Sequence, residues 1–386
     1  MKICFICPEY PPGLQGGVGT FTQIMGRALV RLGHQVRVAG VYPHDYNAPA
    51  YEEDEGVQVW RIHEPVSRLG WVAARYRLYR LIRKWVRARE CDLIECPDAY
   101  GWIAGWPRLS VPLVVRAHGS LTYYAHELHQ PVNPTGHRLE TWAYRRADSW
   151  VAVSKHAAQL TRKLFNLGFG PEAVLYNPVD APSRVPQFST RNIRKVVFTG
   201  TLTEKKGIIS LFRAWPIVKK HFEAAELHVY GKDGAAPDGL GTMRDYLLKS
   251  LPEAMQKSTR FYGHVAREEL IKALSRARAA VFPSYTETFG LGPAEAMACA
   301  CPTIYTRLTC GPEIIRDGVD GLLIDPDQPD QIAAAILKLL VDNETAGYLS
   351  EAGRKRAVQC FGLDRIVAAN EAFFRGTVQN FQRGRV

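Results

Sequence analysis

Two glutamates, Glu287 and Glu295, stand eight positions apart in the segment SYTETFGLGPAEAMA, residues 284–298. Carboxylates can accept hydrogen bonds from vicinal sugar hydroxyls, and the N–H groups of a glycine-rich turn that opens a helix can bind a phosphate. A second interpretation is structural: Glu295 completes a helix capping box and Glu287 is a solvated loop acid. This segment alone leaves both interpretations open.

The neighbouring residues predict how this pair is positioned. An apolar run ending at Phe282 is typical of a strand, residues 283–291 form a loop, and the Gly-Pro pair at 292–293 starts a helix because proline is tolerated in the first turn. Glu295 then falls near the third helical position, and the loop carries Glu287 to the carboxyl end of the strand.

Paired glycines occur in PPGLQGGVGTF, residues 11–21, between the first apolar run and a helical pattern. Their spacing departs from the G-x-G-x-x-G motif of dinucleotide-binding folds. We expect a flexible loop in which Gly16 and Gly17 let the backbone approach a phosphate or a sugar. The alternative is a plain connecting turn.

Charged and titratable side chains follow two other predicted strands. Lys205 and Lys206 lie in FTGTLTEKKGI, residues 198–208, where they either neutralise a diphosphate or are simply solvated. His118 ends the run VVRAHGS, residues 114–120. A lone histidine is more often structural, but a place beside glycine at a strand end strengthens the case for function.

Asp325 and Asp327 in IDPDQPD resemble a metal-binding acid pair. The flanking prolines and the helical pattern QIAAAILKLL that follows predict instead that Asp327 or Asp330 starts a helix. No metal site is predicted.

Short apolar, β-branched runs alternate with helical patterns along the chain, which predicts βαβ units and an α/β protein with parallel sheets. The runs are KICFIC, HQVRVAGVY, DLIEC, PLVVRAHG and SWVAVS before a proline-rich segment at residues 177–192, and KVVFTG, LHVYG, TRFYGHV, AAVFPS, PTIYT and GLLID after it. Ligands of doubly wound sheets bind at the carboxyl ends of the strands, where the motifs above fall.

At 386 residues, the chain is expected to form two doubly wound, Rossmann-like domains facing a cleft. We place the first domain at residues 1–185 and the second at residues 186–365. Residues 366–386 predict a C-terminal helix, which either closes the second domain or crosses back to the first.

Positive charge is concentrated in residues 68–90, RLGWVAARYRLYRLIRKWVRARE, which contribute a net +7 of the chain's +11. An apolar stripe at helical spacing, with Arg75, Arg80, Arg83 and Arg87 off it, predicts a basic amphipathic helix. The stripe comprises Trp71, Ala74, Leu78, Leu81, Ile82 and Trp85. Such a helix either lies on an anionic membrane, binds an acidic acceptor, or packs in the ordinary way with a solvated basic face.

Eight cysteines without zinc-spaced C-x-x-C pairs, several of them in apolar runs, favour buried thiols in a reducing compartment. The N-terminal apolar run is too short for a signal peptide, and no apolar stretch is long enough to span a bilayer. We therefore expect a cytoplasmic protein, peripheral on the inner face of the membrane if the basic helix binds lipid.

The chain resembles the retaining glycosyltransferases of the GT-B fold, specifically glycosyltransferase family 4, also called glycosyl transferases group 1. The resemblance extends over nearly the whole chain, and its most specific element is the pair Glu287 and Glu295 within ETFGLGPAEAMA. The segments GTLTEKKG, YNPVD, AVSK and GVDGLLIDPDQPDQI also match the family.

The resemblance implies that the second domain binds a nucleotide sugar and the first domain its acceptor. Glu295 would hold the ribose diol, and Glu287 would face the donor sugar. The backbone amides of Phe289, Gly290 and Leu291 would hold hydroxyls and phosphate.

The same resemblance implies how the diphosphate and the reacting sugar are contacted. Gly16 and Gly17 would approach the diphosphate, and Lys206 would stabilise its charge. His118 would lie close to the transferred sugar.

One position departs from the family pattern. The family usually has arginine after the first glycine of the GTL-like segment, and this chain has Thr201 there. Either Lys205 supplies the missing charge in the donor site, or donor binding is weaker.

The implied activity is transfer of a hexose-type sugar from a UDP- or GDP-sugar to a glycan or lipid-linked hydroxyl acceptor, in polysaccharide, glycolipid or glycoconjugate synthesis. It would proceed with retention and without metal or other cofactor.

One alternative is a catalytically weak nucleotide-sugar or polyanion-binding protein that uses the basic helix. No helix-turn-helix, zinc-finger or RNA-binding signature accompanies that helix, so no nucleic-acid partner is expected. A phosphorylase of similar fold would need a lysine-bound cofactor site that the sequence does not indicate.

Overall fold

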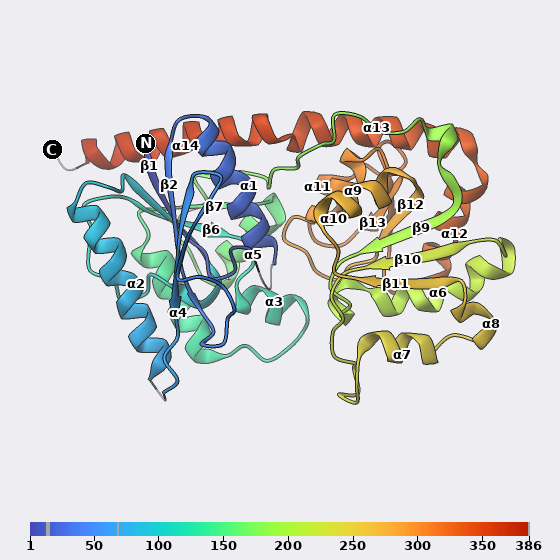
Figure 1. Cartoon of the computed structure of the whole chain (residues 1–386), viewed down its shortest axis with the longest axis horizontal. Helices are drawn as coiled ribbons and strands as arrows, with labels where there is room; N and C mark the ends of the chain where they lie inside the picture. Colours follow the sequence, from blue (N-terminus) through green and yellow to red (C-terminus); the bar gives the residue numbers. More distant parts are fainter. Residues whose placement is uncertain (13–15, 68, 385–386) are drawn as a thin grey trace. The chain divides into compact units, whose positions relative to one another are not determined.

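The computed structural model describes residues 1–12, 16–67 and 69–384. The chain divides into two compact units (Figure 1). Unit 1 comprises Met1–Pro178 with Asp364–Val386, and unit 2 comprises Val179–Leu363. No helix in these described ranges is both long enough and apolar enough to cross a bilayer.

Unit 1 is built on an eight-stranded sheet in the order β3-β4-β2-β1-β5-β6-β7-β8. Its strands are β1 (Lys2–Ile6), β2 (Gln35–Tyr42), β3 (Tyr51–Asp54), β4 (Val57–His63), β5 (Leu93–Pro97), β6 (Leu113–Ala117), β7 (Ser149–Ala152) and β8 (Ala173–Val174). Its helices are α1 (Gly17–Arg31), α2 (Gly70–Arg87), α3 (Leu121–Glu127), α4 (Pro134–Arg146), α5 (Lys155–Leu164) and α14 (Leu363–Arg383), with a short 3₁₀ turn at Ala99–Gly101. Neighbouring strands pair in parallel except β3 and β4, which are antiparallel.

The central strands of unit 1 are almost wholly buried, as expected for parallel strands covered on both faces. Helix α14 contributes to this cover. The Phe374 ring meets Phe5 of β1 edge-on, with the centroids 6.2 Å apart, and Asn370 Oδ1 accepts a hydrogen bond from Arg116 of β6 at 2.6 Å. The last helix of the chain therefore completes unit 1.

Unit 2 contains a six-stranded, all-parallel sheet in the order β11-β10-β9-β12-β13-β14. Its strands are β9 (Asn192–Thr199), β10 (Glu226–Tyr230), β11 (Thr259–Gly263), β12 (Ala277–Phe282), β13 (Thr303–Thr306) and β14 (Leu322–Ile324). Its helices are α6 (Ile208–His221), α7 (Met243–Lys249), α8 (Glu253–Gln256), α9 (Arg267–Ser275), α10 (Leu291–Ala298), α11 (Gly311–Ile314), α12 (Pro329–Val341) and α13 (Asn343–Phe361), with 3₁₀ turns at Phe188–Thr190 and Glu204–Lys206. This is the doubly wound order in which β9 is the first strand and β12 the fourth.

The two α/β units with parallel sheets confirm the predicted fold class, and each apolar run quoted above forms a strand. The hairpin of β3 and β4 was not predicted. It turns at Glu55 and Gly56, which have positive φ of 47° and 85°. This turn is Glu-Gly and not the Asn-Gly or Asp-Gly pair that signals a hairpin, and charged residues in β3 hide the strand pattern.

Candidate functional site

In unit 2, the site is assembled where the strand order changes direction, between β9 and β12. Ligands of doubly wound sheets bind outside the carboxyl ends of the strands at this point. The loops that follow β9 and β12 touch there: Tyr285 N–H donates to the Lys205 carbonyl at 2.8 Å. Gly207 has φ of 68°, and a Cβ on it would lie 1.7 Å from the Pro283 carbonyl oxygen. Only glycine permits this approach of the two loops.

The loop contact brings Lys206 and Glu287 together from positions far apart in the sequence. Lys206 Nζ lies 2.5 Å from Glu287 Oε1, and Ser284 Oγ donates to the same oxygen at 3.2 Å. Glu287 is buried, and the Lys206 side chain is 26% exposed. A cation and an anion are therefore held together at the carboxyl end of the sheet.

The loop after β9 also contains Thr201 and Lys205. Thr201, at the position where the sequence lacks the family's arginine, is exposed. Lys205 is half-buried, and its burial, together with the neighbouring Lys206 ammonium, lowers its pKa. The loop thus brings two cationic side chains, one of them paired with Glu287, to the carboxyl end of β9.

Helix α10 begins at Leu291, two residues before Pro293, the predicted first helical residue, so Glu295 is its fifth residue rather than its third. The reason is Gly290, the N-cap, whose φ of 83° turns the chain into the helix early. A Cβ on Gly290 would lie 2.3 Å from the Tyr305 hydroxyl. Because glycine offers no side-chain cap, the first-turn N–H groups beside Phe289 depend on other acceptors, which is the condition for anion binding.

Glu295 is tied to helix α9. Its Oε1 lies 3.0 Å from Arg267 Nη1, and Arg267 Nη2 also donates to the Asp180 carbonyl at 3.4 Å. Burial raises the pKa of Glu295, while Arg267 lowers it. A capping box is excluded for Glu295 because the N-cap residue, Gly290, has no side chain to complete it.

The acid pair Asp325 and Asp327 takes part in local structure. Asp327 N–H donates to Asp325 Oδ1 at 3.0 Å, and Asp327 Oδ1 accepts from the Tyr285 hydroxyl at 2.9 Å. Helix α12 has Gln328 as its N-cap and Asp330 in its first turn, so of the two predicted helix-start residues only Asp330 lies in the helix. Among the described residues, no group of three or more His, Cys, Asp or Glu could hold a metal ion.

In unit 1, His118 lies just past β6 in a buried position. Its ring meets Phe21 of α1 edge-on, with the centroids 4.8 Å apart. Burial, and secondarily the Arg116 guanidinium, hold the pKa of His118 well below its usual value. The imidazole is therefore neutral near pH 7, which suits hydrogen bonding to a hydroxyl better than neutralising a phosphate.

Two buried acids that the sequence analysis did not identify, Asp98 and Glu140, contact the backbone just past β6 and at the start of α3. Asp98 Oδ1 accepts from the His118 backbone N–H at 3.0 Å, and Asp98 Oδ2 accepts from the Tyr144 hydroxyl at 3.3 Å. Burial and the nearby Glu140 raise the pKa of Asp98 to about 7. Glu140 accepts from the Leu121 N–H at 2.9 Å, at the start of α3. Asp98 directly follows β5, and a polar residue after an apolar run is the signal that would have found it.

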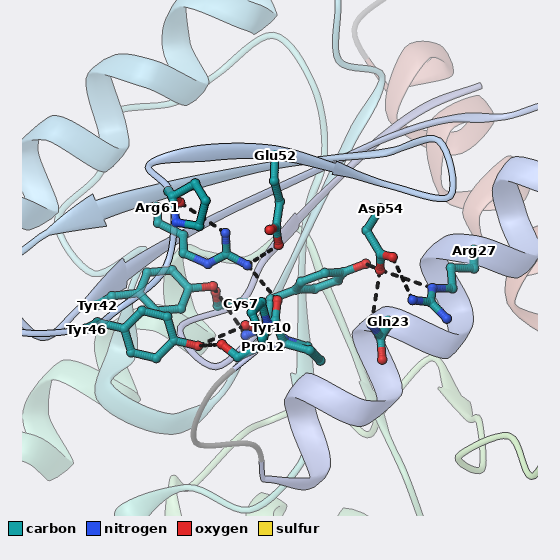
Figure 2. Close-up of polar contacts among 12 residues, drawn as sticks. Cys7, Tyr10, Pro12, Gln23, Arg27, Tyr42, Tyr46, Glu52, Asp54 and Arg61 are labelled. Atoms are coloured by element: carbon teal, nitrogen blue, oxygen red, sulfur yellow. Dashed lines mark hydrogen bonds and ion pairs between the residues drawn. The ribbon is translucent and has the colours of Figure 1, made fainter. Parts of the chain in front are cut away.

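The glycine loop of unit 1 is anchored before it reaches its glycines (Figure 2). The Tyr10 hydroxyl donates to Asp54 Oδ2 at 2.7 Å, and Arg27 Nη2 of α1 lies 2.6 Å from Asp54 Oδ1. The Tyr42 hydroxyl donates to the Cys7 carbonyl at 2.8 Å. The β3–β4 hairpin and α1 thereby fix the segment that leaves β1.

The glycines themselves open helix α1. Gly16 is its N-cap and Gly17 its first residue, while residues 13–15 of this loop lie outside the described part of the chain. Glu9 Oε1 accepts from Gly19 N–H at 2.9 Å, and a Cβ on Gly16 would lie 2.7 Å from Glu9 Oε2. The glycines therefore make room for a carboxylate at the start of the helix, a contact that the sequence analysis did not anticipate.

The predicted basic helix is α2, and Arg68, which precedes it, lies outside the described residues. Arg75 is engaged within unit 1: its Nη1 donates to the Gly101 carbonyl at 2.8 Å, and its guanidinium lies 4.9 Å from the Trp102 ring centroid. Arg80, Arg83 and Arg87 are exposed.

Comparison with known proteins decides the family. A model described as "Glycosyl transferases group 1" matches residues 184–356, and one described as "Glycosyltransferase Family 4" matches residues 15–182. The chain belongs to glycosyltransferase family 4. Its GT-B fold agrees with that of sucrose-phosphate synthase from Thermosynechococcus elongatus, at a TM-score of 0.75 and 20% identity over 97% of this chain and 98% of that one. Anabaena HepE, solved in complex with UDP and glucose, matches at a TM-score of 0.72 and 17% identity over 97% of this chain and all of that one.

Two curated relatives match this glycosyltransferase over most of their length. Glycogen synthase of Mycobacterium tuberculosis is 27% identical, covering 96% of this chain and 93% of the relative. Alpha-maltose-1-phosphate synthase of the same organism is 25% identical, covering 94% of this chain and 95% of the relative.

The glycosyltransferase thus brings together in unit 2 three of the elements singled out from its sequence: Lys206, Glu287 and the start of α10. Glu295 lies further along that helix, where its carboxylate pairs with Arg267. Sequence reasoning missed Arg267, because an arginine at the start of a helix carries no signal of a carboxylate partner elsewhere in the chain.

Proposed function

We propose that this glycosyltransferase moves a hexose-type sugar from a UDP- or GDP-sugar to a hydroxyl acceptor, with retention of anomeric configuration and without a metal. The observation that carries the proposal is the contact of Lys206 with Glu287 beside the N-terminus of α10, at the switch point of the unit 2 sheet. Anabaena HepE has been solved with UDP and with UDP-glucose, which supports a UDP-linked donor.

Charge is the central problem of the reaction. Breaking a sugar–phosphate bond leaves negative charge on the diphosphate and builds positive charge on the sugar. In the proposed donor site of unit 2, Lys206, Lys205 and the first-turn N–H groups of α10 meet the negative charge. Lys206 would exchange part of its contact with the Glu287 carboxylate for the phosphate.

The carboxylates and the imidazole have different proposed tasks. Glu295 accepts from the ribose hydroxyls, while the amides of Gly290 and Leu291 and the Glu287 carboxylate hold hydroxyls of the donor sugar. We assign Glu287 no nucleophilic role, because its Oε1 accepts from both Lys206 and Ser284. His118, neutral because of its burial, forms a hydrogen bond to the transferred sugar.

The proposed acceptor is a glycan or a lipid-linked hydroxyl in polysaccharide, glycolipid or glycoconjugate synthesis. The names of the curated relatives, glycogen synthase and alpha-maltose-1-phosphate synthase, favour glucose-containing products. A reducing, cytoplasmic location agrees with eight free cysteines, seven of them buried.

A second candidate is a nucleotide-sugar-binding protein with weak catalysis. It is favoured by the exposed Thr201 where the family usually has arginine. Lys205 would have to compensate, although its burial, which lowers its pKa, makes its charged form less favourable than in water.

Thermal stabilisation by UDP-, GDP- and ADP-sugars tests the donor site. One nucleotide class should raise the Tm of the wild-type protein and of Glu351→Ala, a control at an exposed glutamate of unit 2. Glu295→Ala should abolish the shift. No response to any donor in the wild-type protein would overturn the proposal. A donor-induced rise in Tm without sugar transfer to water or to any glucan acceptor would favour the second candidate. NMR of a transferred product reports directly whether the anomeric configuration is retained.

A further inference from the structure

The N-terminal end of helix α2 exposes a group of large apolar side chains, here called the apolar tip. The exposed fractions are 81% for Val66, 66% for Leu69, 45% for Trp71, 43% for Val72 and 60% for Tyr76. Single exposed apolar residues are ordinary on a protein surface, but a cluster within one short segment marks an interaction site.

The exposed side of α2 beyond the tip is cationic. The cationic face consists of Arg77, Arg80, Arg83, Lys84 and Arg87, all exposed, and these side chains line a shallow depression on the surface of unit 1. Residues four positions apart lie on one face of a helix. Val72, Tyr76 and Arg80 therefore form one row, and the Arg80 guanidinium lies 6.0 Å from the Tyr76 ring centroid.

The opposite side of α2 is fully engaged by unit 1, so the exposed side has no role in the core. Ala74, Leu78 and Ile82 are completely buried, and Trp85 nearly so. The Trp85 ring packs against Trp60 of β4 with the centroids 4.6 Å apart. Helix α2 is therefore anchored through its buried side and presents Val72, Tyr76 and the cationic face on its exposed side.

We propose that this surface of α2 docks unit 1 on an anionic lipid bilayer, with the apolar tip inserted at the headgroup boundary and the cationic face on the lipid phosphates. An interfacial helix of this type has a basic polar face and apolar or aromatic side chains that enter the membrane. Trp and Tyr favour the interfacial depth, and each Lys or Arg near an anionic leaflet strengthens binding about fivefold. Together these properties account for both halves of the exposed surface.

The apolar tip favours a bilayer over a polyanion such as nucleic acid as the partner of this surface. Nucleic acid would satisfy Arg80 and Arg83 by phosphate contacts, but it offers little to Val66, Leu69 and Val72. A bilayer satisfies both parts of the surface. This docking surface contains none of the proposed donor-site residues, so it stands or falls independently of the donor proposal.

Sedimentation with vesicles tests the docking surface. The full chain should bind vesicles of phosphatidylcholine with phosphatidylglycerol and not vesicles of phosphatidylcholine alone. Arg80→Glu/Arg83→Glu/Arg87→Glu should weaken binding about a hundredfold or more, because three attractive charges become repulsive. Val66→Ser/Leu69→Ser/Val72→Ser should weaken it about tenfold and make the remainder fully salt-reversible.

Matched controls separate this surface from general charge and hydrophobicity. Lys220→Glu/Lys249→Glu/Lys257→Glu changes three exposed lysines of unit 2 by the same charge. Ile193→Ser/Leu240→Ser/Val341→Ser removes apolar side chains that are 52%, 83% and 62% exposed. Both controls should bind vesicles within about twofold of wild type.

Three outcomes would overturn the proposal: equal binding to neutral vesicles, equal loss in the controls, and no vesicle binding together with salt-sensitive binding of duplex DNA or of an acidic protein. Donor-induced stabilisation, measured in parallel, should be unchanged in both α2 variants, which also verifies that they fold. Loss of that stabilisation in every protein, with vesicle binding intact, would count against the donor site alone.

Discussion

The contact of Lys206 with Glu287 allows a quantitative prediction. The two atoms are 2.5 Å apart, and the side chains are only 26% and 11% exposed. At an effective dielectric constant of about 20, unit charges at 4 Å attract by about 4 kcal/mol, and desolvation offsets much of this. Lys206→Met and Glu287→Gln should each lower the free energy of unfolding by about 2–3 kcal/mol, because each leaves a largely buried group without its partner. The double variant should lose only about 3 kcal/mol, which leaves a coupling energy of about 2 kcal/mol.

Urea unfolding of unit 2 measures these values. Trp215 is the only tryptophan between residues 179 and 363 and is completely buried. Fluorine NMR of fluorotryptophan-labelled protein therefore follows unit 2 separately from unit 1, with the resonance assigned by Trp215→Phe. Additive single losses, with a coupling energy below about 0.3 kcal/mol, would refute the inference that this pair is a real interaction.

Donor-induced stabilisation adds a second readout on the same three proteins. If Lys206 serves the diphosphate, the double variant should keep its fold yet lose most of the Tm shift produced by the nucleotide sugar. If Lys206 only neutralises Glu287, the double variant should respond to the donor as the wild-type protein does.

Two further predictions concern the fold around the candidate sites. Gly207→Ala should lower the free energy of unfolding by about 3 kcal/mol or more, because its methyl would lie 1.7 Å from the Pro283 carbonyl at a φ of 68°. The control is Gly239→Ala, at a similar φ of 72° with open space around it. It should lose only about 1 kcal/mol in the same urea titration. Burial and Glu140 raise the pKa of Asp98 to about 7. Between about pH 4 and 7, the folded chain therefore keeps a proton that the unfolded chain has released. This carboxyl makes the free energy of unfolding fall as pH rises, by up to about 4 kcal/mol. Asp98→Asn should remove that slope from a series of Tm values across this range, and an unchanged slope would contradict it.

Sequence periodicity was sufficient for the fold, for a physical reason. Strands buried on both faces must be apolar throughout, so KICFIC or AAVFPS is recognisable wherever it occurs. Their alternation with helices then leaves few topologies, because parallel strands need crossover connections. The β3–β4 hairpin was not predicted because β3 lies at the edge of the sheet, where charged side chains can remain exposed. Glu52 and Glu53 therefore interrupt the apolar pattern by which a strand is recognised.

The candidate site was predictable only in part. Loops at the carboxyl ends of strands could be located, so Lys206 and Glu287 were each expected near the ligand, but their mutual contact depends on how closely two loops approach at Gly207. The start of α10 was misplaced by two residues because Gly290, the N-cap, has a φ of 83° and turns the chain into the helix before the Gly-Pro pair. A Cβ on Gly290 would lie 2.3 Å from the Tyr305 hydroxyl, a contact that depends on the fold and not on local sequence. Asp98 went unnoticed although a polar residue directly after an apolar run is a local signal, because its burial and its contact with the His118 N–H become visible only in the fold.

Helix α14 has a consequence for how the protein is made. Its Asn370 and Phe374 contact β6 and β1, so the first strands of unit 1 depend on a helix that is synthesised after unit 2. During synthesis, the Arg116 guanidinium and the Phe5 ring gain this cover only once unit 2 has been translated. Unit 2, which is continuous in sequence, can fold while the ribosome is still adding residues. The order in which the two units mature is therefore the reverse of the order in which their first strands emerge.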